Sequence, residues 1–162
     1  MSVLFTISVI ASIIAMLTAF AVVFKKQHIL SNSAFSIGLF STAIVIIGDS
    51  IILNWPDLLM QWKKAVFITE IVMVSSWLLF AVSYGRKENW SSFNNLSKLL
   101  FFLSPLLIVF CIAVPIDELF YSPEFNVEKM LFLGNGGYVF NLLLLLYSIF
   151  AIINLEAILR NS

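Results

Sequence analysis

Two carboxylic acids stand deep inside apolar stretches of this 162-residue chain, and they are its best candidates for chemistry. Asp49 lies in STAIVIIGDSIILNWP, and Glu70 lies in ITEIVMVSSWLLF. We expect no Lys, Arg or His within the apolar stretches to neutralise them. Two neighbouring carboxylates in a low dielectric cannot both ionise at low cost, so such a pair is expected to share a proton or to bind a cation. The alternative is structural: each acid is protonated, bonds to a Ser, Thr or Asn side chain, and holds helices together.

The composition is that of a membrane protein. Hydrophobic residues make up 61% of the chain, charged residues make up 11%, and the mean hydropathy is +1.04. Because backbone amides in hydrocarbon must find partners inside their own segment, long apolar stretches predict helices, and the stretches lack the alternation of a β-barrel. We predict an all-α bundle of five transmembrane helices that forms one domain over residues 1–162. The predicted spans are residues 3–24, 34–53, 65–84, 99–114 and 138–157.

The distribution of Lys and Arg predicts the orientation. Six basic residues flank one side of the predicted membrane and three flank the other. The first group is Lys25, Lys26, Arg86, Lys87, Lys98 and Arg160, and the second is Lys63, Lys64 and Lys129. We therefore expect the N-terminus outside the cell, the C-terminus in the cytoplasm, and residues 115–137 as an acidic extracytoplasmic loop.

This topology places the two acids at a similar depth. Asp49 lies about six residues, or roughly 9 Å, from the outer end of its span, and Glu70 lies equally far into the next antiparallel span. Asn141 and Tyr138 begin the last span on the same side. We expect these four side chains to converge in an outer-leaflet pocket that binds a proton or a small ligand.

Side-chain spacing also predicts which faces of the helices pack. Small residues that include Gly38 and Thr42 share a face with Asp49, and Trp77 shares a face with Glu70, so these two faces are expected to meet. Ala11, Ala15 and Ala19 recur at four-residue steps and predict a packing face on the first span.

Other functions have little support in the sequence. No catalytic motif is recognisable, no metal or cofactor is expected, and a net charge of zero gives no reason to expect nucleic-acid binding. The single cysteine, Cys111, lies in an apolar run and is interpreted as a packing residue. GNGG at residues 134–137 follows no strand, so we interpret it as a flexible entry to the last span.

Two segments resemble a known family. ITEIVMVSSWLLFAVSYG and the end of the chain, with NLEAILRN, resemble the N-terminal membrane region of bacterial PEP-CTERM/exosortase-associated sensor histidine kinases of the PrsK type. The acid seven residues before a tryptophan, Glu70 and Trp77, matches the family pattern. Trp77 is therefore a candidate for ligand or proton sensing, together with Asp49, Glu70, Asn141 and Tyr138. The resemblance implies a bacterial inner membrane, a homodimer, and a kinase core in a longer protein, none of whose phosphorylation or ATP-lid motifs occurs here.

Three functional hypotheses remain at this stage. The chain is the sensory input module of a signalling protein, or it is a small transporter that moves a proton or solute past Asp49 and Glu70. The third hypothesis is a complete five-helix protein with a structural or small-molecule-binding role.

Overall fold

The computed structural model describes residues 3–25, 28–55, 59–84, 93–122 and 130–161, without the side chains of residues 60, 61 and 161. Several residues behind the sequence-based expectations lie outside this part of the chain. Among them are Lys26, Arg86, Lys87 and Lys129 of the orientation count and Glu124 and Glu128 of the acidic loop.

The described residues form long helices and one very short hairpin. In chain order the elements are α1 (Val3–Val23), α2 (Ile29–Asn54), α3 (Leu59–Ser83), α4 (Asn95–Ala113), α5 (Ile116–Leu119), β1 (Phe120–Tyr121), β2 (Phe132–Leu133) and α7 (Asn135–Asn161). β1 and β2 pair in antiparallel fashion, with Phe120 opposite Leu133. The expected all-α architecture is confirmed, with the hairpin as a small addition to it.

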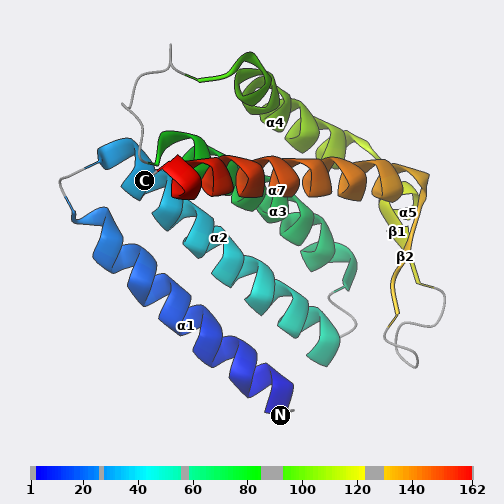
Figure 1. Ribbon diagram of the computed structural model, residues 1–162. Helices are drawn as coiled ribbons and strands as arrows, with labels where there is room; N and C mark the ends of the chain where they lie inside the picture. Colours follow the sequence, from blue (N-terminus) through cyan, green and yellow to red (C-terminus); the bar gives the residue numbers. More distant parts are fainter. Residues whose placement is uncertain (1–2, 26–27, 56–58, 85–92, 123–129, 162) are drawn as a thin grey trace.

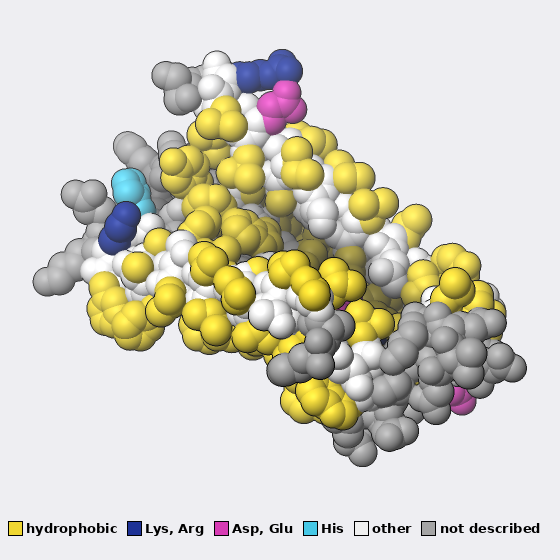
Figure 2. All heavy atoms as spheres, turned by 90° about the horizontal axis from the view of Figure 1, so that it is seen from below, with side chains coloured by type: hydrophobic (Ala, Val, Ile, Leu, Met, Phe, Trp, Pro, Cys, Tyr) yellow, Lys and Arg dark blue, Asp and Glu magenta, His cyan; other side chains and the backbone are white. Residues whose placement is uncertain are grey.

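Five of the described helices are long and apolar enough to cross a membrane: α1, α2, α3, α4 and α7. Figure 2 shows hydrophobic side chains spread over the helices, with charged side chains mostly near the helix ends. The chain is therefore a multi-pass membrane protein. Because five helices cross in alternating directions, the start of α1 and the end of α7 lie at opposite ends of the bundle (Figure 1).

α3 is the central helix of the bundle. It packs against α2, α4 and α7, whereas α1 packs mainly against α2 at the edge (Figure 1). The α3 residues Ile71, Leu78 and Val82 are fully buried, and α1 is exposed over most of its surface. A shift of α3 therefore alters its packing against three neighbouring helices.

Serine hydroxyls join α1 to α2. Ser12 Oγ shares its proton between the Ser8 carbonyl of α1 at 2.8 Å and the Ala43 carbonyl of α2 at 3.3 Å. Ser36 Oγ donates to the Ala19 carbonyl at 2.9 Å. Ser12 is fully buried in this interface, while Ala11 is exposed. The alanine face expected on the first span is thus wrong at Ala11, because a serine adds a hydrogen bond to the close approach that a small residue permits.

A second hydroxyl network lies where α3, α4 and α7 meet. Ser75 Oγ donates to Ser104 Oγ at 2.8 Å, and the Tyr147 hydroxyl of α7 donates to the Leu100 carbonyl of α4 at 2.6 Å. Ser104 and Tyr147 are 3.3 Å apart. Because hydrocarbon offers no competing water, these bonds hold α4 against both α3 and α7.

Glycines bring α7 against α5 and β1. A Cβ at Gly134 would lie 2.3 Å from the Glu118 carbonyl oxygen, and one at Gly137 would lie 1.9 Å from that of Leu119. The Gly134 amide donates to the Leu119 carbonyl at 3.1 Å. The interpretation of GNGG as a flexible entry is wrong, because α7 begins at Asn135 and its glycines provide the space for a close backbone contact.

Another close approach brings α2 against α3. A Cβ at Gly48 would lie 2.5 Å from Val66 Cγ2, and the β-branched valine has little rotamer freedom in a helix. We expect Gly48→Ala to lower the free energy of unfolding by about 1–3 kcal/mol, the usual cost of overpacking. Thermal unfolding in detergent micelles measures this, and Val66→Ala should recover part of the loss in the double variant. Equal stability of Gly48→Ala and the native chain would contradict the contact.

Candidate functional site

Asp49 forms an ion pair with a lysine, in addition to lying near the second acid. Lys63 Nζ of α3 lies 2.7 Å from Asp49 Oδ1 of α2, in a combined hydrogen bond and ion pair. The Lys63 side chain is 12% exposed and the Asp49 side chain is 44% exposed. The expectation that no cation reaches the acids is wrong, because α3 begins at Leu59 and carries Lys63 on its second turn.

Glu70 lies on the same face of α3 as Lys63, two helical turns further along. Its carboxyl group is half-buried and interacts electrostatically with both Lys63 and Asp49. The first interaction is attractive and the second is repulsive. We call Asp49, Lys63 and Glu70 the charge cluster: the Lys63 ammonium group is paired with the Asp49 carboxylate, and Glu70 is within electrostatic range of both. A proton or cation at either acid therefore changes the balance of the other two charges.

The charge cluster is connected to the last helix through an aromatic residue. Lys63 Nζ lies 5.2 Å from the ring centroid of Phe67, within the range of a cation–π interaction. The Phe67 ring lies 5.1 Å from that of Phe140 on α7 and 5.7 Å from that of Phe120 on β1. Sequence reasoning missed Phe67, although its position four residues after Lys63 and three before Glu70 indicates a shared face.

Asn141 and Tyr138 do not complete the site as expected. Asn141 Nδ2 donates to the Gly137 carbonyl of its own helix at 2.9 Å. The Tyr138 side chain is 64% exposed on the outer surface of α7. In the part of the chain that the structure describes, neither side chain forms a hydrogen bond to Asp49 or Glu70, so the candidate site consists of α2 and α3 residues.

Trp77 is a packing residue between α2 and α3. The Trp77 ring packs directly against Gly38, since a Cβ added to Gly38 would lie 3.3 Å from Trp77 Cε2. Trp77 Nε1 donates to Thr42 Oγ1 at 3.4 Å. Trp77 also meets Phe35 edge to face, with ring centroids 5.5 Å apart. The expected contact between these helix faces is confirmed. Trp77 lies seven residues, or roughly 10 Å, along α3 from Glu70 and is outside the charge cluster.

Lys64 has a different role from Lys63. Its Nζ donates to the carbonyls of Ile112 at 2.8 Å and Val114 at 3.1 Å, at the C-terminal end of α4. A cation at this position satisfies carbonyls that lack helical partners and complements the helix dipole. Two adjacent lysines therefore hold α3 to two neighbours, Lys63 to α2 and Lys64 to α4.

The described residues offer no cluster of three or more His, Cys, Asp or Glu side chains for a metal ion. Cys111 is fully buried in α4.

The fold and site define a class: a helical, multi-pass membrane protein with a charged triad between two helices, near the end of the bundle where α2 ends and α3 begins. Comparisons with protein-family models, with curated proteins and with solved structures each find no match.

Proposed function

We propose that this chain is a membrane-embedded sensory module in which the charge cluster receives a chemical signal and α7 transmits it. The observation that supports this is the position of Lys63, which lies 2.7 Å from Asp49 and stacks over Phe67. A single side chain thus joins the acids to the aromatic contact with α7.

The signal we propose is a proton, or a cation that replaces it, at Glu70 or Asp49. Such an event alters the attraction that each carboxyl group exerts on Lys63, and the ammonium group moves toward the acid that stays charged. Phe67 and Phe140 then shift together because their rings are in contact. A signal acts only through a difference in affinity between two packings of the bundle, so those packings must differ at the charge cluster.

The resemblance to PrsK-type kinases is consistent with this role. It would make the chain the input region of a sensor histidine kinase, in a homodimer in a bacterial inner membrane, with a cytoplasmic output domain after α7. The Lys and Arg count supports an external N-terminus and an internal C-terminus. The end of α7 carries the exposed pair Glu156 and Arg160, whose charged atoms are 2.6 Å apart.

Transport is less well supported by the packing around the charge cluster. Beyond Glu70, the inner face of α3 continues with Ile71, Val74 and Leu78, which are apolar and nearly or fully buried. A proton or solute pathway needs polar groups or water across the whole hydrocarbon layer. Among the described residues, the charged side chains between α2 and α3 are confined to one end.

The test measures a conformational response in lipid nanodiscs. Spin labels are attached through cysteines at Ile29 and Ile153, both exposed and near the other end of the bundle, in a chain with Cys111 replaced by alanine. We expect the distance distribution between the labels to change with the pH of the buffer in this chain. Glu70→Gln should remove the change, and Glu156→Gln is the matched control because Glu156 is exposed and far along the last helix.

A second measurement separates sensing from transport. The chain is reconstituted into liposomes with a pH-sensitive dye inside, and a pH gradient is applied. No proton flux above that of empty liposomes is expected. Flux that Glu70→Gln abolishes would replace the sensory proposal with transport, and a pH response that persists in Glu70→Gln would remove Glu70 as the input.

A further inference from the structure

The hairpin of β1 and β2 carries two exposed aromatic rings on its outward side. Tyr121 and Phe132 are cross-strand partners, and their rings are stacked with centroids 5.5 Å apart. Tyr121 is 47% exposed and Phe132 is 43% exposed. We call these two residues the aromatic pair. Met130, two residues before Phe132, is exposed as well, so the outward side of the hairpin is largely apolar.

The other side of the hairpin is buried against the bundle. Phe120 is fully buried, and its ring lies 5.7 Å from that of Phe67 on α3. Successive residues of a strand point to opposite sides, so the burial of Phe120 directs Tyr121 outward. An antiparallel hairpin with one side on a core usually presents polar residues to water on the other. Aromatic rings in that position indicate surroundings less polar than water.

The hairpin lies at the level where the membrane-spanning helices begin and end. Figure 1 shows it at the end of the bundle where α7 begins, and Gly134 alone separates β2 from α7. Phe67, which contacts Phe120, lies five residues, or roughly 8 Å, into the apolar window of α3 that begins at Trp62. Trp62 and Trp55, which follows α2, are exposed at this same end. Because tryptophan and tyrosine concentrate at the membrane–water interface, we infer that the hairpin lies beside the edge of the hydrocarbon layer.

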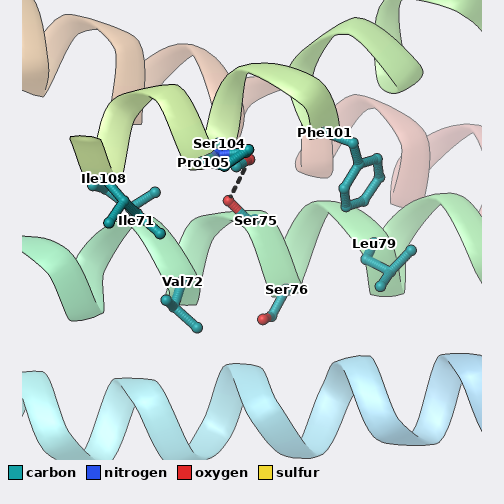
Figure 3. A pocket seen from close by; sticks show the side chains of 9 residues that line it. All are labelled: Ile71, Val72, Ser75, Ser76, Leu79, Phe101, Ser104, Pro105 and Ile108. Carbon is teal, nitrogen blue, oxygen red and sulfur yellow. Dashed lines mark hydrogen bonds between the residues drawn. The ribbon is translucent and has the colours of Figure 1, made fainter. Parts of the chain in front are cut away.

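The surface further along the spans has a different composition. A groove of about 230 Å³ between α3 and α4 has mostly aliphatic walls, which include Val72, Leu79 and Ile108 (Figure 3). Ser75 and Ser104, which also line it, are bonded to each other at 2.8 Å. Aliphatic walls suit acyl chains. An aromatic ring that carries a hydroxyl group suits the boundary between acyl chains and headgroups.

We propose that the aromatic pair is a docking surface for the lipid headgroup layer and anchors the hairpin at the boundary between headgroups and acyl chains. The two rings lie against the acyl chains, and the Tyr121 hydroxyl donates to ester or phosphate oxygens. The interaction does not depend on anionic lipids, because α5, directly before β1, exposes the acids Asp117 and Glu118. Part of the acidic loop expected from the sequence is thus a lipid-binding element. This role is independent of the proposed sensing by the charge cluster.

Spin-label accessibility in phosphatidylcholine nanodiscs measures the depth of the hairpin. A nitroxide is attached to Met130→Cys in the full chain with Cys111→Ala, and its saturation is compared with oxygen and with a water-soluble nickel complex. Oxygen concentrates in hydrocarbon and the complex stays in water. The exposed α4 position Leu106→Cys is the hydrocarbon reference, and the free label in buffer is the water reference. We expect the label at residue 130 to lie between the two references. Nickel accessibility equal to that of the free label would place the hairpin in water and overturn the proposal.

The double variant Tyr121→Ser with Phe132→Ser tests the aromatic pair itself. The label at residue 130 should shift toward the water reference, and Phe132→Ser alone should give a smaller shift in the same direction. Phe20→Ser with Phe24→Ser is the matched control, because these two rings of α1 are also exposed and lie 4.8 Å apart. An unchanged depth in the first double variant, or an equal shift in both, would show that the pair is not an anchor. Nanodiscs that hold two chains should give no broadening between labels. Broadening that the first double variant removes would make a second copy the occupant and overturn the proposal.

Discussion

Gly137→Ala should strongly destabilise the protein, although the same change usually stabilises a helix. Alanine in a helix interior is ordinarily favoured over glycine by about 0.5–1 kcal/mol. Here the new Cβ would lie 1.9 Å from the Leu119 carbonyl oxygen and 2.9 Å from its carbonyl carbon. Both are backbone atoms that cannot rotate away. Moving them breaks the bond from the Gly134 amide, so we expect a loss of about 3 kcal/mol or more.

Gly136→Ala is the matched control, because it makes the same chemical change one residue earlier in the same helical turn. Its Cβ would lie 3.1 Å from the Glu118 carbonyl oxygen, which a shift of a few tenths of an ångström relieves. Thermal unfolding in detergent micelles should place Gly136→Ala near the native chain and Gly137→Ala far below it. Similar unfolding temperatures for the two variants would mean that α5 and the start of α7 are not in close contact.

The membrane fold is predictable from sequence because it depends on the length and polarity of whole segments. The ends of the helices are less predictable. The apolar pattern predicts a third span from residue 65, but α3 begins at Leu59 and includes both Lys63 and Lys64. A helix continues past the end of its apolar run where long side chains such as lysine carry their charge to a partner.

This shift in the start of α3 accounts for the largest error at the site. The apolar pattern alone places Lys63 outside the span and so predicts two acids, Asp49 and Glu70, without a cation. Antiparallel helices bring the two acids within electrostatic range of one another. Predicting the partner of Asp49 also requires knowing how the Lys63 side chain extends across the interface between α2 and α3. The spacing of residues along a single helix does not contain that information.

The contact between Trp77 and Gly38 is one that residue spacing along the helices is sufficient to predict. Both residues lie in the middle of long helices, where the period of 3.6 residues reliably assigns a face. Tyr138 shows the opposite case. It lies in the first turn of α7, where the rotation of the helix is determined by the glycines that pack against Leu119, and its side chain faces outward as a result.

Lys63→Gln should be the most damaging change within the charge cluster. It removes the ion pair with Asp49, the attraction on Glu70 and the contact with Phe67, while the repulsion between the two acids remains. Removing one partner of a fully buried pair costs about 3–5 kcal/mol. Because the Asp49 side chain is 44% exposed and solvent screens it, we expect a smaller loss of about 1–3 kcal/mol.

The origin of that loss can be tested by removing the repulsion as well. In the double variant Asp49→Asn with Lys63→Gln, only one acid remains in the cluster, so much of the stability should return, and a double-mutant cycle gives the coupling. For the single variant, the deficit should shrink as the pH falls, because protonation of either carboxyl group ends the repulsion. Lys64→Gln, which affects only the end of α4, should show neither rescue by Asp49→Asn nor that pH dependence. If the Lys63→Gln deficit is constant with pH and unaffected by Asp49→Asn, Lys63 stabilises the bundle by packing alone, and the charge cluster loses its proposed role as the input.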